Sequence, residues 1–221
     1  MNTRFEFRWD FVTQRWPVLW AGLQMTIYIT VVAMALALVL GLIVALCRMS
    51  RNRFVSGAAQ IYINVFRAIP LFVFIIWLYY GLPIVLGINF DPIVAGVACL
   101  AVQYSSWLAE IYRAGIGAVG KGQREAAMSI GLTSVQTFND VVFPQALRIS
   151  LPPIGNNFVG MLKDSSLVSI IGVFELIRQS QLAVSQTFRP FEFYTATALI
   201  YIALTLLLSQ GVNWLEKRQK F

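Results

Sequence analysis

The amino-acid sequence predicts an all-α membrane protein with several transmembrane helices. Its 221 residues are 58% hydrophobic and 12% charged, with a mean hydropathy of +0.70, which is too apolar for a soluble globular domain. Four stretches reach the ~20 apolar residues that a bilayer core requires, and a fifth of sufficient length carries several polar residues. None alternates polar and apolar residues as barrel strands do, so each is predicted to be a helix that satisfies its own backbone groups in lipid.

The five predicted spans follow one another along most of the chain. They cover residues 19–47, 55–82, 92–117, 151–171 and 194–215. The fourth stretch carries four polar residues, Asn156, Asn157, Lys163 and Asp164. It is still predicted to be a span because its other residues are mostly apolar. Residues 1–18 mix charges with aromatic rings and have no cleavage site after a short apolar run. We therefore expect residues 1–18 to lie at the membrane interface as an external segment.

The distribution of lysine and arginine predicts the orientation. The connection after the first span, the long connection at residues 118–150 and the tail at residues 216–221 are basic, whereas residues 83–92 contain neither lysine nor arginine. With five spans, the three basic regions lie on one side, and basic connections stay in the cytoplasm. The N-terminus is therefore predicted outside and the C-terminus inside. The net charge of +7 is explained by this topology without any nucleic acid.

Several kinds of chemistry are excluded. The chain has no histidine, and its two cysteines, Cys47 and Cys99, stand alone in apolar stretches, so the sequence offers neither a usual general base nor a metal site. Residues 115–122 resemble a phosphate-binding loop, but Gly122 stands where the hydroxyl that binds Mg²⁺ should be, and the segment ends a membrane span. We expect no catalytic site and no bound cofactor. If ATP drives the protein, a separate chain must bind it.

The connection at residues 118–150 is predicted to be a short helix, a break and a second helix. Gly131 can adopt the left-handed conformation that closes the first helix, and Thr133 and Gln136 have the spacing of a capping box that starts the second. Pro144 is expected to limit the length of that second helix. On these residues alone, an ordinary amphipathic hairpin is an equally good interpretation.

The order Glu125-Ala126-Ala127, Gly131 and Pro144 resembles the EAA loop of permease subunits in binding-protein-dependent ABC importers. Residues 64–71, 110–116, 144–148 and 163–168 further resemble the polar amino-acid permeases that serve histidine, arginine, glutamine and glutamate uptake. The resemblance implies five spans, an outside N-terminus and an EAA loop that docks on an ATPase. It also implies that residues 173–190 lie along the outer membrane surface.

The same resemblance implies amino-acid import by alternating access in a bacterial inner membrane, by a transporter subunit rather than an enzyme. The implied partners are a cytoplasmic ABC ATPase dimer, a second permease subunit that is identical or paralogous, an extracytoplasmic amino-acid-binding protein and the surrounding lipid. The alternative is a passive channel or facilitator that is not coupled to ATP.

Polar residues inside the spans are the candidates for substrate binding, because ionisable groups in a bilayer usually face protein or a wet cavity. Asn157, Gly160, Met161 and Asp164 have the spacing of one helix face. Asn64, Arg67 and Leu71 form a second stripe, which Pro70 is expected to distort.

We expect Asp164 to hold the α-amino group of an amino acid, and Arg67 or a helix N-terminus to hold its carboxylate. Asn157 would contact the side chain, and because it is uncharged it favours a neutral or acidic substrate. Weaker candidates in the third span are Gln103, Ser106 and Trp107. The alternative is a structural ion pair between Arg67 and Asp164, and Glu110 and Arg113 are expected to form a local pair.

Overall fold

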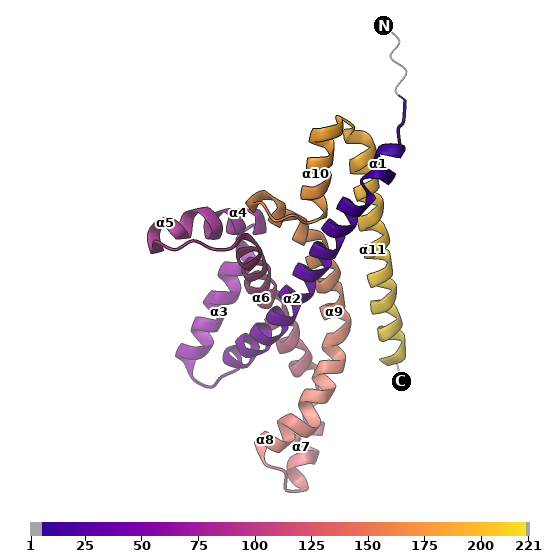
Figure 1. Ribbon diagram of the computed structural model, residues 1–221. Helices are drawn as coiled ribbons and strands as arrows, with labels where there is room; N and C mark the ends of the chain where they lie inside the picture. Colours follow the sequence, from indigo (N-terminus) through magenta and orange to yellow (C-terminus); the bar gives the residue numbers. More distant parts are fainter. Residues whose placement is uncertain (1–5, 220–221) are drawn as a thin grey trace.

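The computed structural model describes residues 6–219 and the side chains of residues 6–217, and every regular element in this part of the chain is helical. Part of the predicted basic tail therefore lies outside the described residues. The elements, drawn in Figure 1, are α1 (Asp10–Gln14), α2 (Trp16–Arg48), α3 (Arg53–Ala68), α4 (Leu71–Ile76), the π-helical turn η1 (Trp77–Gly81), α5 (Leu82–Leu86), α6 (Pro92–Ala118), α7 (Lys121–Ser129), α8 (Ser134–Gln136), the π-helical turn η2 (Thr137–Val142), α9 (Phe143–Asp164), the 3₁₀ segment η3 (Ser165–Ile171), α10 (Leu176–Thr187) and α11 (Pro190–Gln219).

Three helices in the described chain are long and apolar enough to cross a membrane by themselves: α2, α6 and α11 over Pro190–Lys217. Two further spans are obtained only if each of two bent helix pairs counts as one. The first pair joins α3 to the segment Leu71–Leu86 with a bend of 103°, and the second joins Ser134–Ile171 to α10 with a bend of 51°. The chain thus has three to five candidate spans. The second predicted span is not a straight helix, because the 103° bend lies within it, whereas the 51° bend follows Ile171, the last residue of the fourth predicted span.

The break in the second predicted span lies at Ile69 and Pro70. Ile69 has an extended backbone with ψ 127°, as expected for a residue that precedes proline, because the proline ring disfavours the helical conformation there. In Figure 1, α4 and α5 run across the direction of α3. The expected distortion at Pro70 is confirmed, and it is a complete change of direction.

Side-chain caps fix the starts of two long helices. The Asn52 side chain accepts a hydrogen bond from the Phe54 amide at 2.9 Å, which starts α3. The Asp91 carboxylate accepts from the amides of Ile93 and Val94 at 2.9 and 3.1 Å, just before α6. Caps of this kind satisfy amides that have no partner in the first helical turn.

The long helices α2, α6 and α9 pack against one another, with α6 between its two neighbours. A Cβ atom on Gly41 of α2 would lie 2.8 Å from Leu108 and 3.1 Å from the Ser105 carbonyl of α6, so the two backbones approach closely there. Small residues allow such approach between helices in membranes. Cys99 is fully buried in the same core, as expected for a small apolar residue.

Pro144 does not have the role that the sequence predicted. The chain stays helical from α8 through η2 into α9, and Pro144 occupies the first turn of α9. Proline is tolerated in a first turn, because its missing amide would have had no partner within that helix. The fourth predicted span therefore continues a helix that begins well before residue 151.

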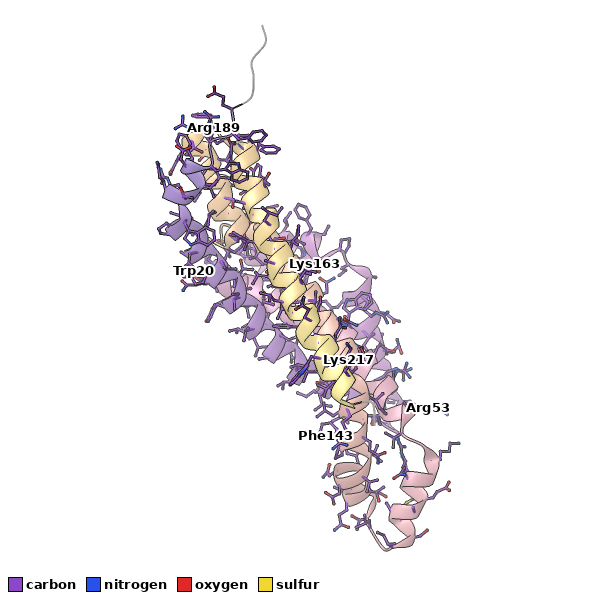
Figure 2. The ribbon with its side chains drawn as sticks, turned by 90° about the vertical axis from the view of Figure 1, so that its right-hand side faces the viewer. Trp20, Arg53, Phe143, Lys163, Arg189 and Lys217 are labelled. Atoms are coloured by element: carbon purple, nitrogen blue, oxygen red, sulfur yellow. The ribbon has the colours of Figure 1, made fainter. Side chains whose placement is uncertain are left out.

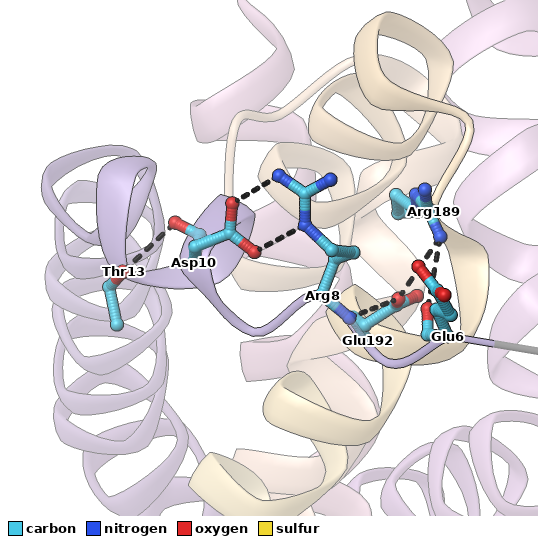
Figure 3. Close-up of polar contacts among 6 residues, drawn as sticks. All are labelled: Glu6, Arg8, Asp10, Thr13, Arg189 and Glu192. Atoms are coloured by element: carbon cyan, nitrogen blue, oxygen red, sulfur yellow. Dashed lines mark hydrogen bonds and ion pairs between the residues drawn. The ribbon is translucent and has the colours of Figure 1, made fainter.

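The N-terminal segment is held against the start of α11 at the end of the molecule opposite α7 and α8 (Figures 1 and 3). The Arg8 amide donates to Glu192, which is fully buried, at 3.1 Å. Arg189 lies 3.7 Å from the Glu192 carboxylate and donates to the Glu6 carbonyl at 3.2 Å. Arg8 also hydrogen-bonds Asp10 at 2.8 and 2.9 Å and holds the pKa of that carboxyl below its ordinary value.

Basic residues mark both ends of the long axis. In Figure 2, Arg189 lies at one end of α11. Lys217 and Arg53 lie toward the opposite end, which is also the end of the molecule that carries α7 and α8. Arg53 and Lys217, which belong to two of the connections predicted to share one side, thus lie toward the same end.

Candidate functional site

A cavity of about 600 Å³ opens where the break between α3 and α4 faces α6 and α9. We call it the Asp164 cavity. It is lined by Arg67, Ala68, Ile69, Pro70, Leu71, Gln103, Tyr104, Trp107, Asn156, Asn157, Gly160 and Asp164. Four predicted substrate-binding residues come together in it, namely Arg67, Gln103, Asn157 and Asp164. The stripe predicted on α9 is confirmed in part, because Met161 points away and is fully buried in the core.

Asp164, the last residue of α9, accepts a hydrogen bond from the Tyr104 hydroxyl at 2.7 Å. Gly160, one turn earlier, makes room for the tyrosine, since a Cβ there would lie 3.2 Å from its hydroxyl oxygen. Tyr104 was not among the residues predicted from the sequence, because a tyrosine within an apolar helix has no distinguishing pattern. One carboxylate oxygen of Asp164 has this partner, and the other has no hydrogen bond within the described chain.

Arg67 lies over the indole ring of Trp107, with its guanidinium carbon 4.4 Å from the ring centroid. This is the geometry of a cation–π contact. The ion pairs among the described residues join Arg8 to Asp10, Arg113 to Glu110 and Arg189 to Glu192, so the predicted alternative of an Arg67–Asp164 pair is not formed. Arg67 and Asp164 therefore line one cavity without neutralising each other.

Gln103 satisfies the backbone at the helix break. Its side-chain amide donates to the Ile69 carbonyl at 2.7 Å, which would otherwise be left open where α3 ends. Ser106 is buried and bonds to the Gln103 carbonyl in its own helix, so its contact is structural. Asn64 lines no described cavity next to Arg67 and instead accepts from Gln60 at 2.7 Å.

A second cavity of about 620 Å³ lies nearer the α7–α8 end of α6 and α9. We call it the Glu110 cavity. It shares Arg67, Trp107 and Asn157 with the first, and its other lining residues are Glu110, Ile111, Arg113, Ala114, Gly115, Ala118, Ile149, Ser150 and Pro153. Arg113 bonds Glu110 at 2.7 Å, which confirms the predicted local pair.

The two cavities follow one another along α6 and α9 and share Arg67, Trp107 and Asn157. The Asp164 cavity offers one carboxylate and one guanidinium, which match the ammonium and carboxylate of a zwitterion. Asn157 donates its amide to the Pro153 carbonyl at 3.0 Å, so its side-chain oxygen is left as an acceptor. The arrangement suits a small zwitterionic solute.

The segment from α7 to α8 forms the helix–break–helix that the sequence predicts. Gly131 has φ +87°, and its amide and that of Leu132 donate to the carbonyls of Met128 and Ala127 at 3.0 and 3.2 Å. These two bonds make a Schellman motif. Thr133 and Gln136 form the predicted capping box, with the Gln136 side chain accepting from the Thr133 amide at 2.9 Å.

The surface of this corner is more apolar than expected from the sequence. Met128, Ile130 and Val135 are 50%, 80% and 68% exposed. Glu125 and Ala126 are exposed beside them, whereas Ala127 is buried against its own chain. Apolar residues in an otherwise charged connection are the signal that could have identified this patch, which we call the corner patch (Met128, Ile130 and Val135).

Comparison with known families identifies the chain. Residues 37–221 match the family described as the binding-protein-dependent transport system inner membrane component. The chain belongs to this family. The predicted resemblance of the chain to such permeases is thereby confirmed.

Relatives over nearly the whole length are amino-acid permeases. The chain is 35% identical over 216 residues to the glutamine transport system permease protein of Escherichia coli, covering 97% of this chain and 99% of the relative. It is 39% identical over 197 residues to a probable glutamine ABC transporter permease protein of Bacillus subtilis, covering 89% and 91%. An L-cystine transport system permease protein of Bacillus subtilis is 38% identical over 217 residues, covering 96% and 89%. These are transporter subunits, in agreement with the expectation that the chain is not an enzyme.

Solved structures show the same fold. A chain of an amino acid ABC transporter crystallised with histidines matches with a TM-score of 0.90 and 38% identity, covering 97% of this chain and all of that one. A chain of the inward-facing methionine ABC transporter matches with a TM-score of 0.80 at 17% identity, covering 94% and 99%. The fold is that of a type I ABC importer permease.

Proposed function

We propose that this chain is the membrane-spanning subunit of a bacterial ATP-binding-cassette importer that moves an amino acid across the inner membrane by alternating access. Family membership supports import of this kind, and the observation that carries the substrate class is the Asp164 cavity. It places Arg67 and Asp164 on one cavity without pairing them. A zwitterion supplies both missing partners.

In this proposal the chain has five spans, with the bent pairs counted as one each, an external N-terminus and a cytoplasmic C-terminus. The Asp164 cavity then lies on the outer side of the Glu110 cavity. The basic connections, including the one that carries Arg48 and Arg53, face the cytoplasm, as the positive-inside rule requires. Residues 173–190 lie at the outer surface.

Asp164 holds the α-amino group and Arg67 the carboxylate of the substrate. Gln103 and Asn157 border the space for its side chain. Because the charges of Arg67 and Asp164 are used by the zwitterion, the substrate side chain meets uncharged groups, which favours a neutral or acidic amino acid. Two of the relatives are named for glutamine, which is neutral.

The proposed importer requires three kinds of partner protein. A cytoplasmic ATPase dimer binds ATP and docks on α7, α8 and the corner patch, whose exposed apolar side chains have no cover in the single chain. A second permease subunit, identical or paralogous, closes the cavities from the side. An external amino-acid-binding protein delivers the substrate.

Affinity purification of the chain from its native host in mild detergent tests these partners. Mass spectrometry should find a stoichiometric ATPase, with or without a second permease. If the chain is monodisperse but no ATPase co-purifies with it in several detergents, the result would instead favour the passive-facilitator alternative. A matched control is a variant with Ile130→Ser and Val135→Ser, which keeps the membrane helices and should lose the ATPase.

A further inference from the structure

Only two non-helical residues separate α6 from α7. α6 ends at Ala118 and α7 begins at Lys121, and the residues between them, Val119 and Gly120, have extended backbones with ψ 118° and 139°. A Cβ atom on Gly120 would meet nothing within 4 Å beyond its chain neighbours. A short extended link that contains an open glycine lets one helix turn relative to the next. The orientation of α7 therefore depends on contacts made outside this link.

The side chain of Arg124, in α7, reaches across the link to α6. Its Nη2 donates a hydrogen bond to the Ile116 carbonyl at 2.9 Å. Ile116 lies in the last turn of α6, where carbonyls have no partner within the helix and the helix dipole favours a positive charge. None of the ion pairs among the described residues involves Arg124. The Arg124–Ile116 hydrogen bond is thus charge-assisted and spans the link.

Ile116 belongs to a well-packed part of the molecule, where α6 meets η2 and α9. It is buried in a cluster with Val119, Val142 and Ala146. A Cβ atom on Gly115 would lie 2.9 Å from the Ala146 carbonyl, so the backbones of α6 and α9 are in close contact here. α6 and α9 therefore form one body at this level, and Arg124 binds to a fixed point on it.

The other attachments of α7 to this body are weaker or less direct. α7 packs against η2, and Ala127 is the buried residue of α7 within the described chain. An alanine methyl group buries little apolar area. Beyond Gly131 the chain enters α8 and stays helical through η2 into α9. The corner is thus attached at both of its ends only while Arg124 is bound to Ile116.

We propose that Arg124 is a positioning residue that fixes α7 on α6, so that movement of the corner by the ATPase reaches the two cavities. The proposal rests on the proposed function, since it takes the ATPase to dock on α7, α8 and the corner patch. With the Arg124–Ile116 hydrogen bond in place, a displacement of α7 moves α6 and α9, which line both cavities. Without this bond, α7 turns at Gly120 and the displacement is not transmitted.

Arg124→Leu tests this role in the importer reconstituted with its ATPase, partner permease and binding protein. Leucine keeps an apolar stem and removes both the donor and the charge. Transport per ATP hydrolysed should fall about tenfold, the factor that corresponds to losing one hydrogen bond to a charged group. The ATPase rate should persist, and the apparent KM for the transported amino acid should be unchanged, because Arg124 lines neither cavity. Arg124→Lys keeps a donor and the charge and should restore most of the coupling.

Arg148→Leu is the matched control. Arg148 is an exposed arginine of α9 that lines neither cavity and enters none of the ion pairs among the described residues. Its replacement removes the same charge and should leave transport per ATP near the wild-type value. An equal fall in Arg124→Leu and Arg148→Leu would overturn the proposal. Loss of the co-purifying ATPase from Arg124→Leu would also overturn it, because Arg124 would then act in docking.

Amide hydrogen exchange tests the contact itself. In Arg124→Leu, the amides of residues 123–130 should exchange about tenfold faster than in the wild type, because α7 is no longer fixed on α6. The amides of residues 137–142, which belong to the continuous helix into α9, should keep their rates. Wild-type exchange rates throughout α7 would show that Arg124 does not hold this helix and would contradict the proposal.

Failure of this proposal and failure of the proposed function have different signatures. ATP-driven uptake by the wild type, with unchanged transport per ATP in Arg124→Leu, removes the role of Arg124 and leaves the function. Absence of ATP-driven uptake by the wild type removes the function. If Arg124→Leu does not assemble, Arg124→Gln, whose shorter side chain carries no charge, replaces it and should show the same fall. Normal coupling in that variant would overturn the proposal.

Discussion

Asp164 is the residue on which the substrate site depends most directly. It keeps one carboxylate oxygen for Tyr104 and leaves the other without a hydrogen-bond partner in the described chain. Asp164→Asn can still accept from the tyrosine but loses the negative charge. We expect the apparent affinity for the transported amino acid to fall about 10- to 100-fold, the range for losing a hydrogen bond to a charged group. Uptake kinetics of the reconstituted importer measure this change.

Tyr104→Phe is the matched control for that substitution. It removes the hydroxyl that positions Asp164 and keeps both the ring and the charge. We expect a smaller loss of affinity than with Asp164→Asn. Unchanged substrate affinity in an intact Asp164→Asn complex would exclude Asp164 from substrate binding.

For single residues, the sequence predicts which side chains share a helix face, but not which residues of other helices they contact. The spacing of Asn157, Gly160 and Asp164 places them on one side of a helix, and the structure has them on one cavity. Their neighbours on α6 depend on the register between two helices, which one sequence does not encode. Arg67 therefore contacts the indole ring of Trp107 and not Asp164, and this contact could not be predicted from the sequence.

Among the elements, the corner between α7 and α8 is the proposed coupling device. Gly131 has φ +87°, a conformation that costs a branched residue about 1–3 kcal/mol. Gly131→Val should shift the corner, so that ATP hydrolysis continues while transport per ATP falls. Comparing ATPase rate with uptake in proteoliposomes measures this uncoupling.

Gly57→Val is the matched control, because Gly57 lies within α3, outside the α7–α8 corner, with open space around it and no positive φ. It should leave coupling near the wild-type level. Glu125→Lys should uncouple as Gly131→Val does, since it reverses a charge on the exposed surface beside the corner patch. Normal coupling in both Gly131→Val and Glu125→Lys would show that the corner does not transmit the ATPase motion.

The N-terminal segment is a second element whose position depends on one defined contact, the buried Glu192 carboxylate. Glu192→Leu removes the acceptor of the Arg8 amide and the partner of Arg189. We expect amide hydrogen exchange in residues 8–15 to speed up about tenfold, since a hydrogen bond to a charged group contributes about 1.5–3 kcal/mol. Glu6→Leu is the control, because Glu6 contributes its main-chain carbonyl to Arg189. Equal exchange in the two variants would show that Glu192 does not fasten the segment.

Helix starts and the corner motifs were predictable because capping boxes and left-handed glycines are local signals. The positions and angles of helix breaks were less predictable. Pro70 signals a distortion, but the 103° change of direction depends on how Leu71–Leu86 packs. Pro144 signals a helix end, yet the π-helical turn at Thr137–Val142 carries the chain into α9.

Considered as a whole, the chain is one of two permease subunits in the proposed larger assembly. The apolar part of α6 is 67% buried within the chain, whereas that of α11 is only 17% buried. Such surfaces need lipid or a second permease subunit as cover. Composition predicted the membrane, and the order of basic connections predicted its orientation. Which helices are central follows from tertiary packing, so composition could not reveal it.

The central claim is ATP-driven import of an amino acid, and the most direct test is uptake of labelled L-glutamine and L-glutamate. Liposomes hold the chain with the ATPase, permease and binding protein that accompany it, and ATP is placed on the ATPase side. We predict accumulation above the external concentration only when ATP and the binding protein are both present. Equilibration to the same level with or without ATP would contradict it and identify a passive facilitator.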